Sequence, residues 1–356
     1  MELYRRRLEK LQQAMLREGV DVYLAATQVN MQYLSGFSEP PLERLMFLLV
    51  SQQGEPVWFT PALSAASTAT NPAGWQTRYV WHDSDGPSRA LDACTRDFDL
   101  ETATIAVDDE MPASFLLRLQ EALPAALFRA GGELMGSVRA VKDAEELRCM
   151  REAARLTDDA LASGLERCME GYSEWAVAIA IQRALFDMGS KLAFGIPLVA
   201  SGEMSAMPHH TTSQRALQKG DIVVIDFGGV YEGYCSDITR VACVGRASDE
   251  ARAVYEIVYE AHMRAREAAK PGVLPAKSIA LRVLSLRRRA TATTSFIARG
   301  TESGYPSTSR PTSRRPTTGF WRLGTASRSS QGSTCRASSA CASRMSTPSP
   351  SAAANR

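Results

Sequence analysis

Two aspartates on either side of a glycine-rich turn are the residues of this chain best suited to bind a cation. Asp226 ends the apolar run at residues 222–225, and Asp237 follows eleven residues later. The glycines between them are typical of a turn, so we expect the two carboxylates on adjacent antiparallel strands. An ionised carboxylate at the end of a buried strand needs a cation, an arginine or strong hydrogen bonds. A pair of divalent ions bridged by both carboxylates would satisfy this need.

A second interpretation of the same aspartates involves no metal. Asp226 would cap a turn, and Asp237 would form an ion pair with Arg240. The spacing alone favours this interpretation slightly.

Two of the four histidines, His209 and His210, are adjacent in the loop that precedes the first of these strands. Neighbouring side chains point in different directions, so we expect at most one of them to serve the same site as the aspartates. That histidine would act as an acid or as a hydrogen-bond donor to an oxyanion. The alternative is an imidazole on the surface without a role.

Alternating strands and helices predict an α/β domain over residues 1–135. The clearest signals are a helix at 3–18, strands at 20–25, 45–51, 55–60 and 104–107, and a helix at 113–123. The pattern breaks between Gly132 and Arg139, which favours a domain boundary near residue 135.

Residues 136–277 predict an α+β domain in which long helices pack on antiparallel strands. We expect helices at 143–168, 174–188 and 250–270, with Ser173 as an N-cap, and strands at 194–200, 221–227 and 238–244. Gly228-Gly229 lacks the spacing of a phosphate-binding loop.

Charge is distributed unevenly along the chain. The total is +2, but residues 1–277 carry 28 basic and 38 acidic residues, a net charge of −10, whereas residues 278–356 carry +12 with 13 Arg and no Lys. This last segment is rich in Ser, Thr and Pro and has no helical or strand period, which predicts a disordered tail. No apolar run approaches the roughly 20 residues of a membrane span, and we expect a cytoplasmic protein. The seven cysteines form no Cys-x-x-Cys pair, which argues against a disulfide framework.

Four motifs together resemble the Xaa-Pro dipeptidases (prolidases) and aminopeptidase P enzymes of the pita-bread metallopeptidases, which also include creatinase. They are Phe194-Gly-Ile-Pro-Leu-Val-Ala-Ser-Gly202, Ser205-Ala-Met-Pro-His-His210, Lys219-Gly-Asp-Ile-Val-Val-Ile-Asp-Phe-Gly228 and Gly233-Tyr-Cys-Ser-Asp-Ile-Thr-Arg240. Tyr33-Leu-Ser-Gly-Phe37 resembles the N-terminal domain of the prolidase branch. The resemblance covers about residues 1–277 and implies a creatinase-like N-terminal domain followed by a pita-bread catalytic domain.

The resemblance implies hydrolysis of the peptide bond that precedes a proline, in a dipeptide or at the N-terminus of a peptide. A hydroxide that bridges two divalent ions, manganese, cobalt or zinc, would attack the carbonyl. Asp226 and Asp237 correspond to two metal ligands of the family, and His209 corresponds to the histidine that stabilises the tetrahedral intermediate. Homodimers are common in the family.

Three further ligands that the family needs are missing from the C-terminal part. The family places them in Gly-His-Gly-Ile-Gly, Ile-Glu-Pro-Gly and Arg-Ile-Glu-Asp, and none of these segments occurs in this chain. A shifted reading frame explains the loss. If each true codon takes the third base of one written codon and two bases of the next, Gly300-Thr-Glu-Ser-Gly304 is compatible with Gly-His-Gly-Ile-Gly, and the other two segments follow in order.

We therefore predict that the frame slipped near Lys277-Ser278, so that residues 136–277 form an incomplete catalytic domain and residues 278–356 form a replaced tail. Thr301, Ser330 and Arg344 then stand where the three ligands belong. Hydroxyls are poor ligands beside carboxylates, and Arg344 would bring a positive charge. The expected protein is inactive and poorly soluble.

Two other functional classes stay open. One is a non-catalytic binding protein that keeps the fold. The other uses the arginines of the tail to bind nucleic acid. Against nucleic-acid binding, the tail has no Lys, and the frame shift explains its composition without any partner. The resemblance implies a proline-containing peptide as substrate, and we expect neither a nucleic acid nor a membrane as partner.

Overall fold

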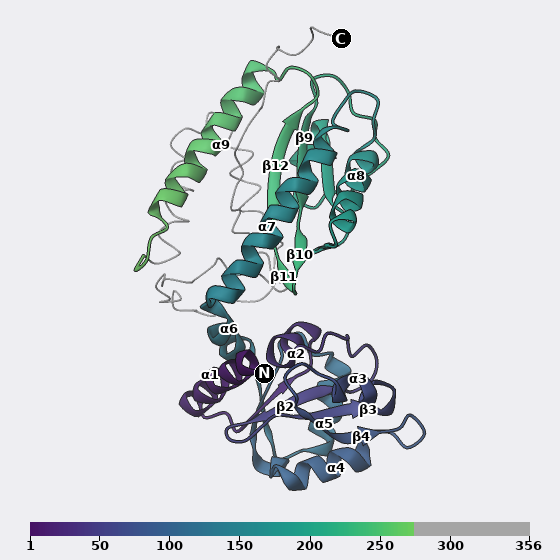
Figure 1. Cartoon of the computed structure of the whole chain (residues 1–356), viewed down its shortest axis with the longest axis vertical. Coiled ribbons are helices and arrows are strands. Elements are labelled where there is room, and N and C mark those ends of the chain that lie inside the picture. Colours follow the sequence, from purple (N-terminus) through teal and green to yellow (C-terminus); the bar gives the residue numbers. More distant parts are fainter. Residues whose placement is uncertain (274–356) are drawn as a thin grey trace. The chain divides into compact units, whose positions relative to one another are not determined.

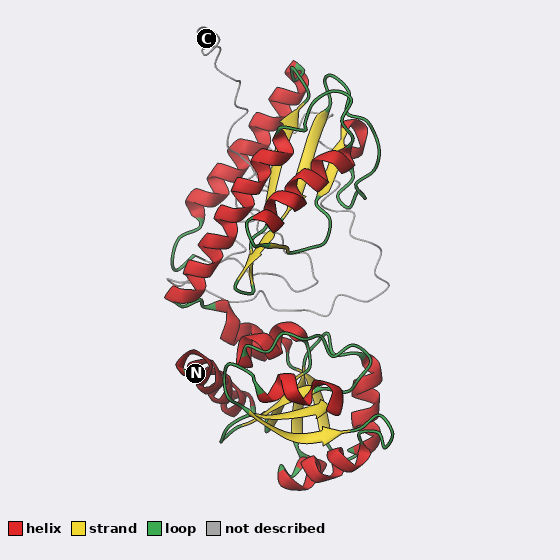
Figure 2. Cartoon of the chain, turned by 45° about the vertical axis from the view of Figure 1, so that its right-hand side comes forward, coloured by secondary structure: helices red, strands yellow, loops and turns green. Residues whose placement is uncertain are grey.

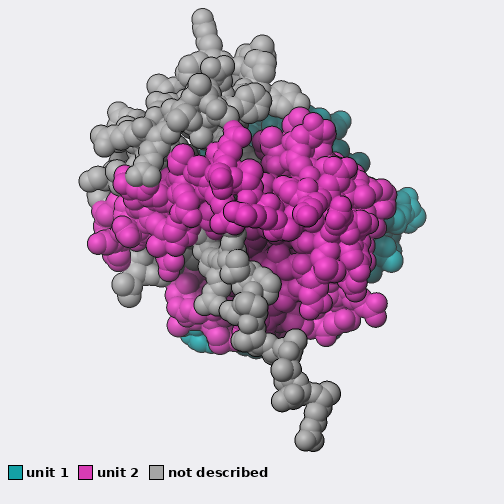
Figure 3. Space-filling view, turned by 90° about the horizontal axis from the view of Figure 1, so that it is seen from above, with its two compact units in different colours: residues 1–141 teal, residues 142–356 magenta. Residues whose placement is uncertain are grey.

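The computed structural model describes residues 1–273, which belong to two compact units (Figures 1 and 3). Unit 1 comprises Met1–Val141, and unit 2 begins at Lys142. The predicted domain limit at residue 135 lies inside a helix of unit 1, α6. None of the helices in residues 1–273 combines the length and the hydropathy that a membrane span requires.

Unit 1 is built on a six-stranded mixed sheet in the order β4-β3-β2-β1-β5-β6. Its strands are β1 (Val22–Ala25), β2 (Phe47–Ser51), β3 (Val57–Pro61), β4 (Gln76–Trp81), β5 (Thr104–Val107) and β6 (Leu127–Ala130). Its helices are α1 (Glu2–Glu18), α2 (Gln28–Ser35), α3 (Ala65–Ala69), α4 (Ser88–Asp97), α5 (Ala113–Ala122) and α6 (Gly132–Ala140), with short 3-10 turns at Ala62–Ser64 and Leu100–Thr102. The strands predicted at 45–51 and 55–60 correspond to β2 and β3, which pair antiparallel as a hairpin.

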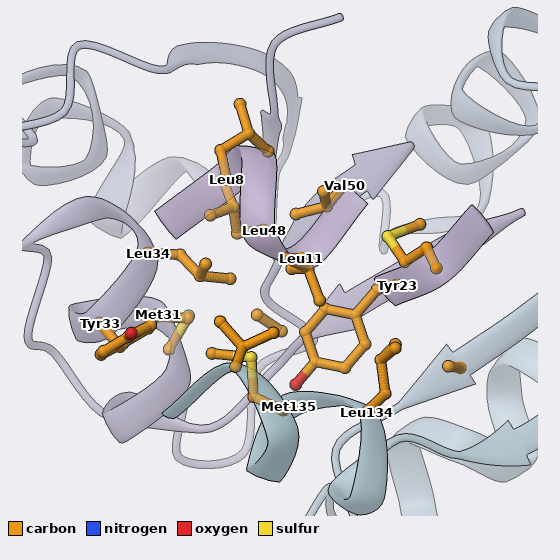
Figure 4. Close-up of a cluster of buried hydrophobic side chains, with 14 of the residues drawn as sticks. Leu8, Leu11, Tyr23, Met31, Tyr33, Leu34, Leu48, Val50, Leu134 and Met135 are labelled. Carbon is orange, nitrogen blue, oxygen red and sulfur yellow. The ribbon is translucent and has the colours of Figure 1, made fainter. Parts of the chain in front are cut away.

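Both faces of this sheet are covered by buried apolar side chains, because alternate strand residues point to opposite sides. On one side Tyr23, Leu48 and Val50 pack against side chains of α1, α2 and α6, including Leu11 and Met135 (Figure 4). The other side carries a second buried cluster, with residues of α4 and α5 packed on the sheet.

The predicted break between Gly132 and Arg139 is wrong, since these residues lie in α6. Three glycines, at positions 131, 132 and 136, make the segment look irregular in sequence. Leu134, Met135 and Val138 nevertheless share one helical face and are buried in the core of unit 1. Tertiary packing therefore overrides the low helix propensity of glycine.

Unit 2 packs helices on one face of an antiparallel sheet, β12-β9-β8, and adds a small second sheet, β11-β10-β7 (Figure 2). Its strands are β7 (Lys191–Leu192), β8 (Leu198–Ser201), β9 (Ile222–Phe227), β10 (Gly229–Tyr231), β11 (Tyr234–Cys235) and β12 (Ile238–Cys243). Its helices are α7 (Ala144–Leu165), α8 (Glu174–Asp187) and α9 (Asp249–Ala268), and Gly202–Ala206 is a 3-10 turn.

The ends of the long helices follow the sequence signals. Asp143 and Glu146 form a capping box at the start of α7, in which each side chain accepts a hydrogen bond from the backbone N–H of the other residue. Ser173 caps α8 as predicted, with its hydroxyl accepting from the N–H of Ala176. Val177, Ile181 and other residues of α7 and α8 form one buried cluster with Val223, Ile225 and their neighbours in the sheet.

The strand predicted at 194–200 is too long. β8 begins at Leu198, while Phe194 and Ile196 are exposed. Gly195 has a φ of 82°, and Pro197 has no N–H to donate, so neither residue suits a regular strand. The predicted tail, residues 278–356, lies outside the described residues.

Candidate metal centre

Asp226 and Asp237 lie on one antiparallel hairpin that is interrupted once. Its first part pairs β9 with β12 and places Asp226 opposite Thr239; its second part pairs β10 with β11 in the same register. Continued across the interruption, this register places Asp237 opposite Gly228. Alternate residues share a face, so Asp237 falls on the face of Thr239 and Asp226. The predicted pairing of two antiparallel strands is thereby confirmed, whereas the roles of the carboxylates stay predictions.

The carboxylate of Asp226 is oriented by a residue of the opposite strand. The hydroxyl of Thr239 donates a hydrogen bond to Oδ1 of Asp226 at 2.9 Å, and both residues are half-buried. A hydroxyl in this position fixes the carboxylate in the way that supporting residues fix metal ligands.

Helix α7 is hydrogen-bonded to the hairpin at the point where its strands are interrupted. Thr157 of α7 is hydrogen-bonded to the hydroxyl of Ser236 and accepts from the N–H of Gly229 at 3.0 Å. The N–H of Ser236 also donates to the carbonyl of Gly229 at 2.9 Å. Because the strands approach so closely here, a Cβ at Gly228 would lie 1.9 Å from the carbonyl oxygen of Ser236. Glycine is therefore required opposite Asp237.

Two further contacts tie the hairpin to α7. The hydroxyl of Tyr234 donates to Oε1 of Glu146 at 3.0 Å, and Glu146 is buried. Arg240, which the interpretation without metal pairs with Asp237, forms an ion pair with Asp158 at 2.9 Å. The helix thus contacts the hairpin on both sides of Asp237.

Two carboxylates are suitable ligands for a divalent cation, but they are too few to complete its coordination. Carboxylate oxygens are ordinary ligands of such ions, but zinc takes about four ligands and harder cations take about six or more. Within residues 1–273, no group of three or more His, Cys, Asp or Glu side chains is arranged to hold a metal ion. Asp226 and Asp237 alone would therefore not complete the coordination of such an ion.

His209 and His210 lie in the loop between the 3-10 turn and the segment that leads to β9. His209 is exposed, whereas the side chain of His210 is 12% exposed, and its Nε2 lies 2.8 Å from Oε2 of Glu174. The two rings therefore differ in environment, as expected for neighbouring residues.

The loop is anchored beside Asp226. The hydroxyl of Thr212 donates to the carbonyl of Pro197 and accepts from the N–H of Val199. These residues flank Leu198, which is paired with Asp226. His209 is three residues from Thr212, a span of at most about 10 Å.

Sequence reasoning missed Thr239, Thr157 and Glu174. Thr239 could have been found, because it follows Asp237 by two residues and therefore shares its face in a strand. Glu174 gives no such signal, since an acidic residue after Ser173 is ordinary at the start of a helix. Its contacts with residues 27 to 39 positions away depend on the tertiary fold.

Two family patterns match the chain. The Creatinase/Prolidase N-terminal domain matches residues 7–141, and metallopeptidase family M24 matches residues 148–301. The predicted frame junction near Lys277 lies inside the second match.

Relatives with a known role are similar over most of the chain. The Xaa-Pro dipeptidase of Pyrococcus furiosus is 29% identical over 269 residues, which is 75% of this chain and 73% of the relative. Among solved structures, the prolidase of Thermococcus sibiricus is 30% identical with a TM-score of 0.74, covering 80% of this chain and 77% of that chain. The dipeptidase PepE of Mycobacterium ulcerans is 32% identical with a TM-score of 0.74, covering 81% and 77%.

These similarities confirm the predicted fold class, an α/β creatinase-like N-terminal domain followed by an α+β pita-bread catalytic domain. They extend through both units and include enzymes named for the cleavage of Xaa-Pro dipeptides. The chain belongs to metallopeptidase family M24.

Proposed function

We propose that the intact catalytic domain hydrolyses the Xaa-Pro bond of dipeptides or of longer peptides at their N-terminus. The observation that carries this proposal is the antiparallel pairing of β9 and β12, which places Asp226 opposite Thr239, two residues from Asp237. These carboxylates would bind divalent ions, which lower the pKa of water and polarise a peptide carbonyl. The carboxylates hold their positions because Thr239 and α7 support the hairpin. His209 would donate a hydrogen bond to the oxygen that becomes negative in the tetrahedral intermediate.

We further propose that the chain as written is inactive, because the frame shift removes three ligands. The substituted positions, Thr301, Ser330 and Arg344, lie outside the described residues. Two observations support the proposal: none of the three ligand segments occurs in the sequence, and the match to the Pyrococcus furiosus relative covers 73% of that protein. In this proposal the N-terminal domain runs to Val141, where unit 1 ends, rather than to the predicted residue 135; the incomplete catalytic domain then runs to residue 277, and residues 278–356 are the replaced tail. We also propose that the protein forms a homodimer.

The test begins with the nucleotide sequence across codons 270–300. A frame that encodes Gly-His-Gly-Ile-Gly, Ile-Glu-Pro-Gly and Arg-Ile-Glu-Asp supports the shift, and a gene without these segments contradicts it. The protein with the restored frame is then assayed on a Xaa-Pro dipeptide and on a tripeptide with proline second, with manganese, cobalt or zinc added. The two substrates separate dipeptidase from aminopeptidase activity.

Substitutions in the restored enzyme test the assigned residues. Asp226→Asn and Asp237→Asn should each lower kcat/KM by about 100-fold or more, since each removes a charged ligand. His209→Ala should lower kcat by about 100-fold. Asp187→Asn is the matched control, because Asp187 is exposed on α8, and it should leave activity unchanged. Equal activities of the Asp187 and Asp226 variants would contradict the assignment.

A further inference from the structure

Glu174, the first residue of α8, is an acidic residue to which the proposed chemistry gives no role, and its side chain is completely enclosed. An ionised carboxylate is costly to bury unless several hydrogen bonds compensate it. The contacts that Glu174 receives therefore indicate what it does.

Each oxygen of Glu174 binds one end of the loop at residues 202–212. Oε1 accepts from the N–H and the hydroxyl of Ser201, the last residue of β8, at 2.8 and 2.6 Å. Oε2 accepts from the N–H and the hydroxyl of Ser213 at 3.0 and 2.7 Å. One carboxylate thus closes the loop that carries both histidines.

A third part of the loop, the ring of His210, is bound to the same carboxylate. Its Nε2 lies 2.8 Å from Oε2 of Glu174. The ring of His210 is thereby held inward, while the adjacent His209 is exposed. Holding the ring of His210 also restrains the backbone of the loop next to His209, since the two residues share a planar peptide unit.

The backbone of α8 strengthens the closure at the C-terminal end of the loop. The N–H of Trp175 donates to the carbonyl of Ser213 at 3.0 Å, and the N–H of Glu174 donates to the carbonyl of Arg215 at 3.1 Å. Ser213 is therefore bound through its backbone and its side chain to the same turn of helix.

We propose that Glu174 is the positioning residue of the loop that carries His209, holding both ends of the loop and the ring of His210 in place. The proposal rests on the proposed function insofar as His209 takes part in hydrolysis. Glu174 acts through the loop and does not touch the substrate.

Glutamine at this position is a sharp test because it keeps the shape of glutamate and changes its hydrogen bonding. Its amide has one acceptor oxygen and an NH2 group. In either orientation the NH2 group faces the backbone N–H of Ser201 or of Ser213, and two donors repel. One end of the loop therefore loses its partner.

The experiment measures hydrogen exchange in the full chain as written, by mass spectrometry, so it needs no enzymatic activity. Glu174→Gln should raise amide exchange in residues 201–213 by about tenfold or more, because at least one hydrogen bond to a charged group is lost. Exchange at the imidazole C2 of His210 should change in the same variant. Glu170→Gln is the control, since Glu170 is exposed, and it should match the parent. Equal exchange in the two variants would overturn the proposal.

A milder variant covers the case in which Glu174→Gln unfolds unit 2. Ser213→Ala removes one hydroxyl and keeps the N–H that binds Oε2. It should raise exchange within residues 201–213 by a few-fold and leave α7 unchanged; no rise in this segment would overturn the proposal.

Kinetics of the restored enzyme separate this inference from the proposed function. Glu174→Gln should lower kcat while KM changes less, because the loop would present His209 in more than one position. An inactive restored enzyme contradicts the proposed function, whereas the exchange result stands by itself. An unchanged kcat together with a loosened loop would overturn the link to His209.

Discussion

Unit 1 and the described part of unit 2 differ in how completely their sheets are covered. In unit 1 buried clusters cover both faces of the six-stranded sheet. Among the described residues of unit 2, the buried cluster lies on the face of β8–β9–β12 that α7 and α8 cover. The opposite face carries Ile222, Val224 and Asp226, which are only half-buried. The N-terminal unit therefore has buried clusters on both faces of its sheet, whereas in the described part of unit 2 the sheet face that carries Asp226 is only half-buried.

Removing a core side chain from unit 1 should have the largest effect on stability. Leu11 is fully buried, so Leu11→Ala should lower the free energy of unfolding of unit 1 by about 2–5 kcal/mol. Leu63→Ala is the control, since Leu63 is 76% exposed, and should change it by less than about 0.5 kcal/mol. Urea unfolding followed by tryptophan fluorescence measures both, since Trp58, Trp75 and Trp81 are buried in unit 1. Equal losses would show that unit 1 does not depend on this core.

Adding one methyl group to a glycine should have opposite effects on the stability of the two units. Gly228→Ala should destabilise unit 2 by about 1–3 kcal/mol, because the new Cβ meets the carbonyl of Ser236 at 1.9 Å. Gly136→Ala should stabilise unit 1 by up to about 1 kcal/mol, because it lies in α6 with open space at its Cβ. Thermal unfolding of the two variants checks the opposite signs. A harmless Gly228→Ala would mean that the hairpin is not closed beside Asp237.

A smaller effect is expected from the residue that orients Asp226. Thr239→Val keeps the shape of the side chain but removes its hydroxyl, so manganese affinity of the restored protein should fall about tenfold. Titration calorimetry measures it, with Thr211→Val as the control, since Thr211 is exposed. Unchanged affinity would remove Thr239 from the support of the site.

The smallest effect is a dependence on pH. Burial raises the pKa of Glu174, but hydrogen bonds from Ser201, His210 and Ser213 outweigh it and hold the pKa below its ordinary value. A carboxyl with a lowered pKa in the folded state stabilises it fully above the unfolded pKa, about 4.3, and loses this contribution as the pH falls through the folded value. The stability difference between the parent and Glu174→Gln should therefore shrink below about pH 4. A difference that is constant with pH would contradict the ionised state of Glu174.

The sequence predicted the elements of both units well where local signals and packing agree. The capped starts of α7 and α8 and the strand β9 followed from residue types and spacing. Helix α6 could not be predicted in this way, because three glycines lower its helix propensity and its apolar face is stabilised only by packing in the core of unit 1. In the candidate site, the sequence predicted that Asp226 and Asp237 lie on adjacent antiparallel strands, but it missed Thr239. The contacts of Glu174 could not be predicted, because they join segments that are distant in sequence.

The chain belongs to metallopeptidase family M24, and we propose that it lost the activity together with its C-terminal ligands. The most direct measurement is hydrolysis of a Xaa-Pro dipeptide by the written and the restored proteins side by side, with and without manganese. We predict hydrolysis by the restored protein only, dependent on the metal and abolished by Asp226→Asn. Cleavage by the written protein, or none by a folded restored protein that binds manganese, would contradict the account.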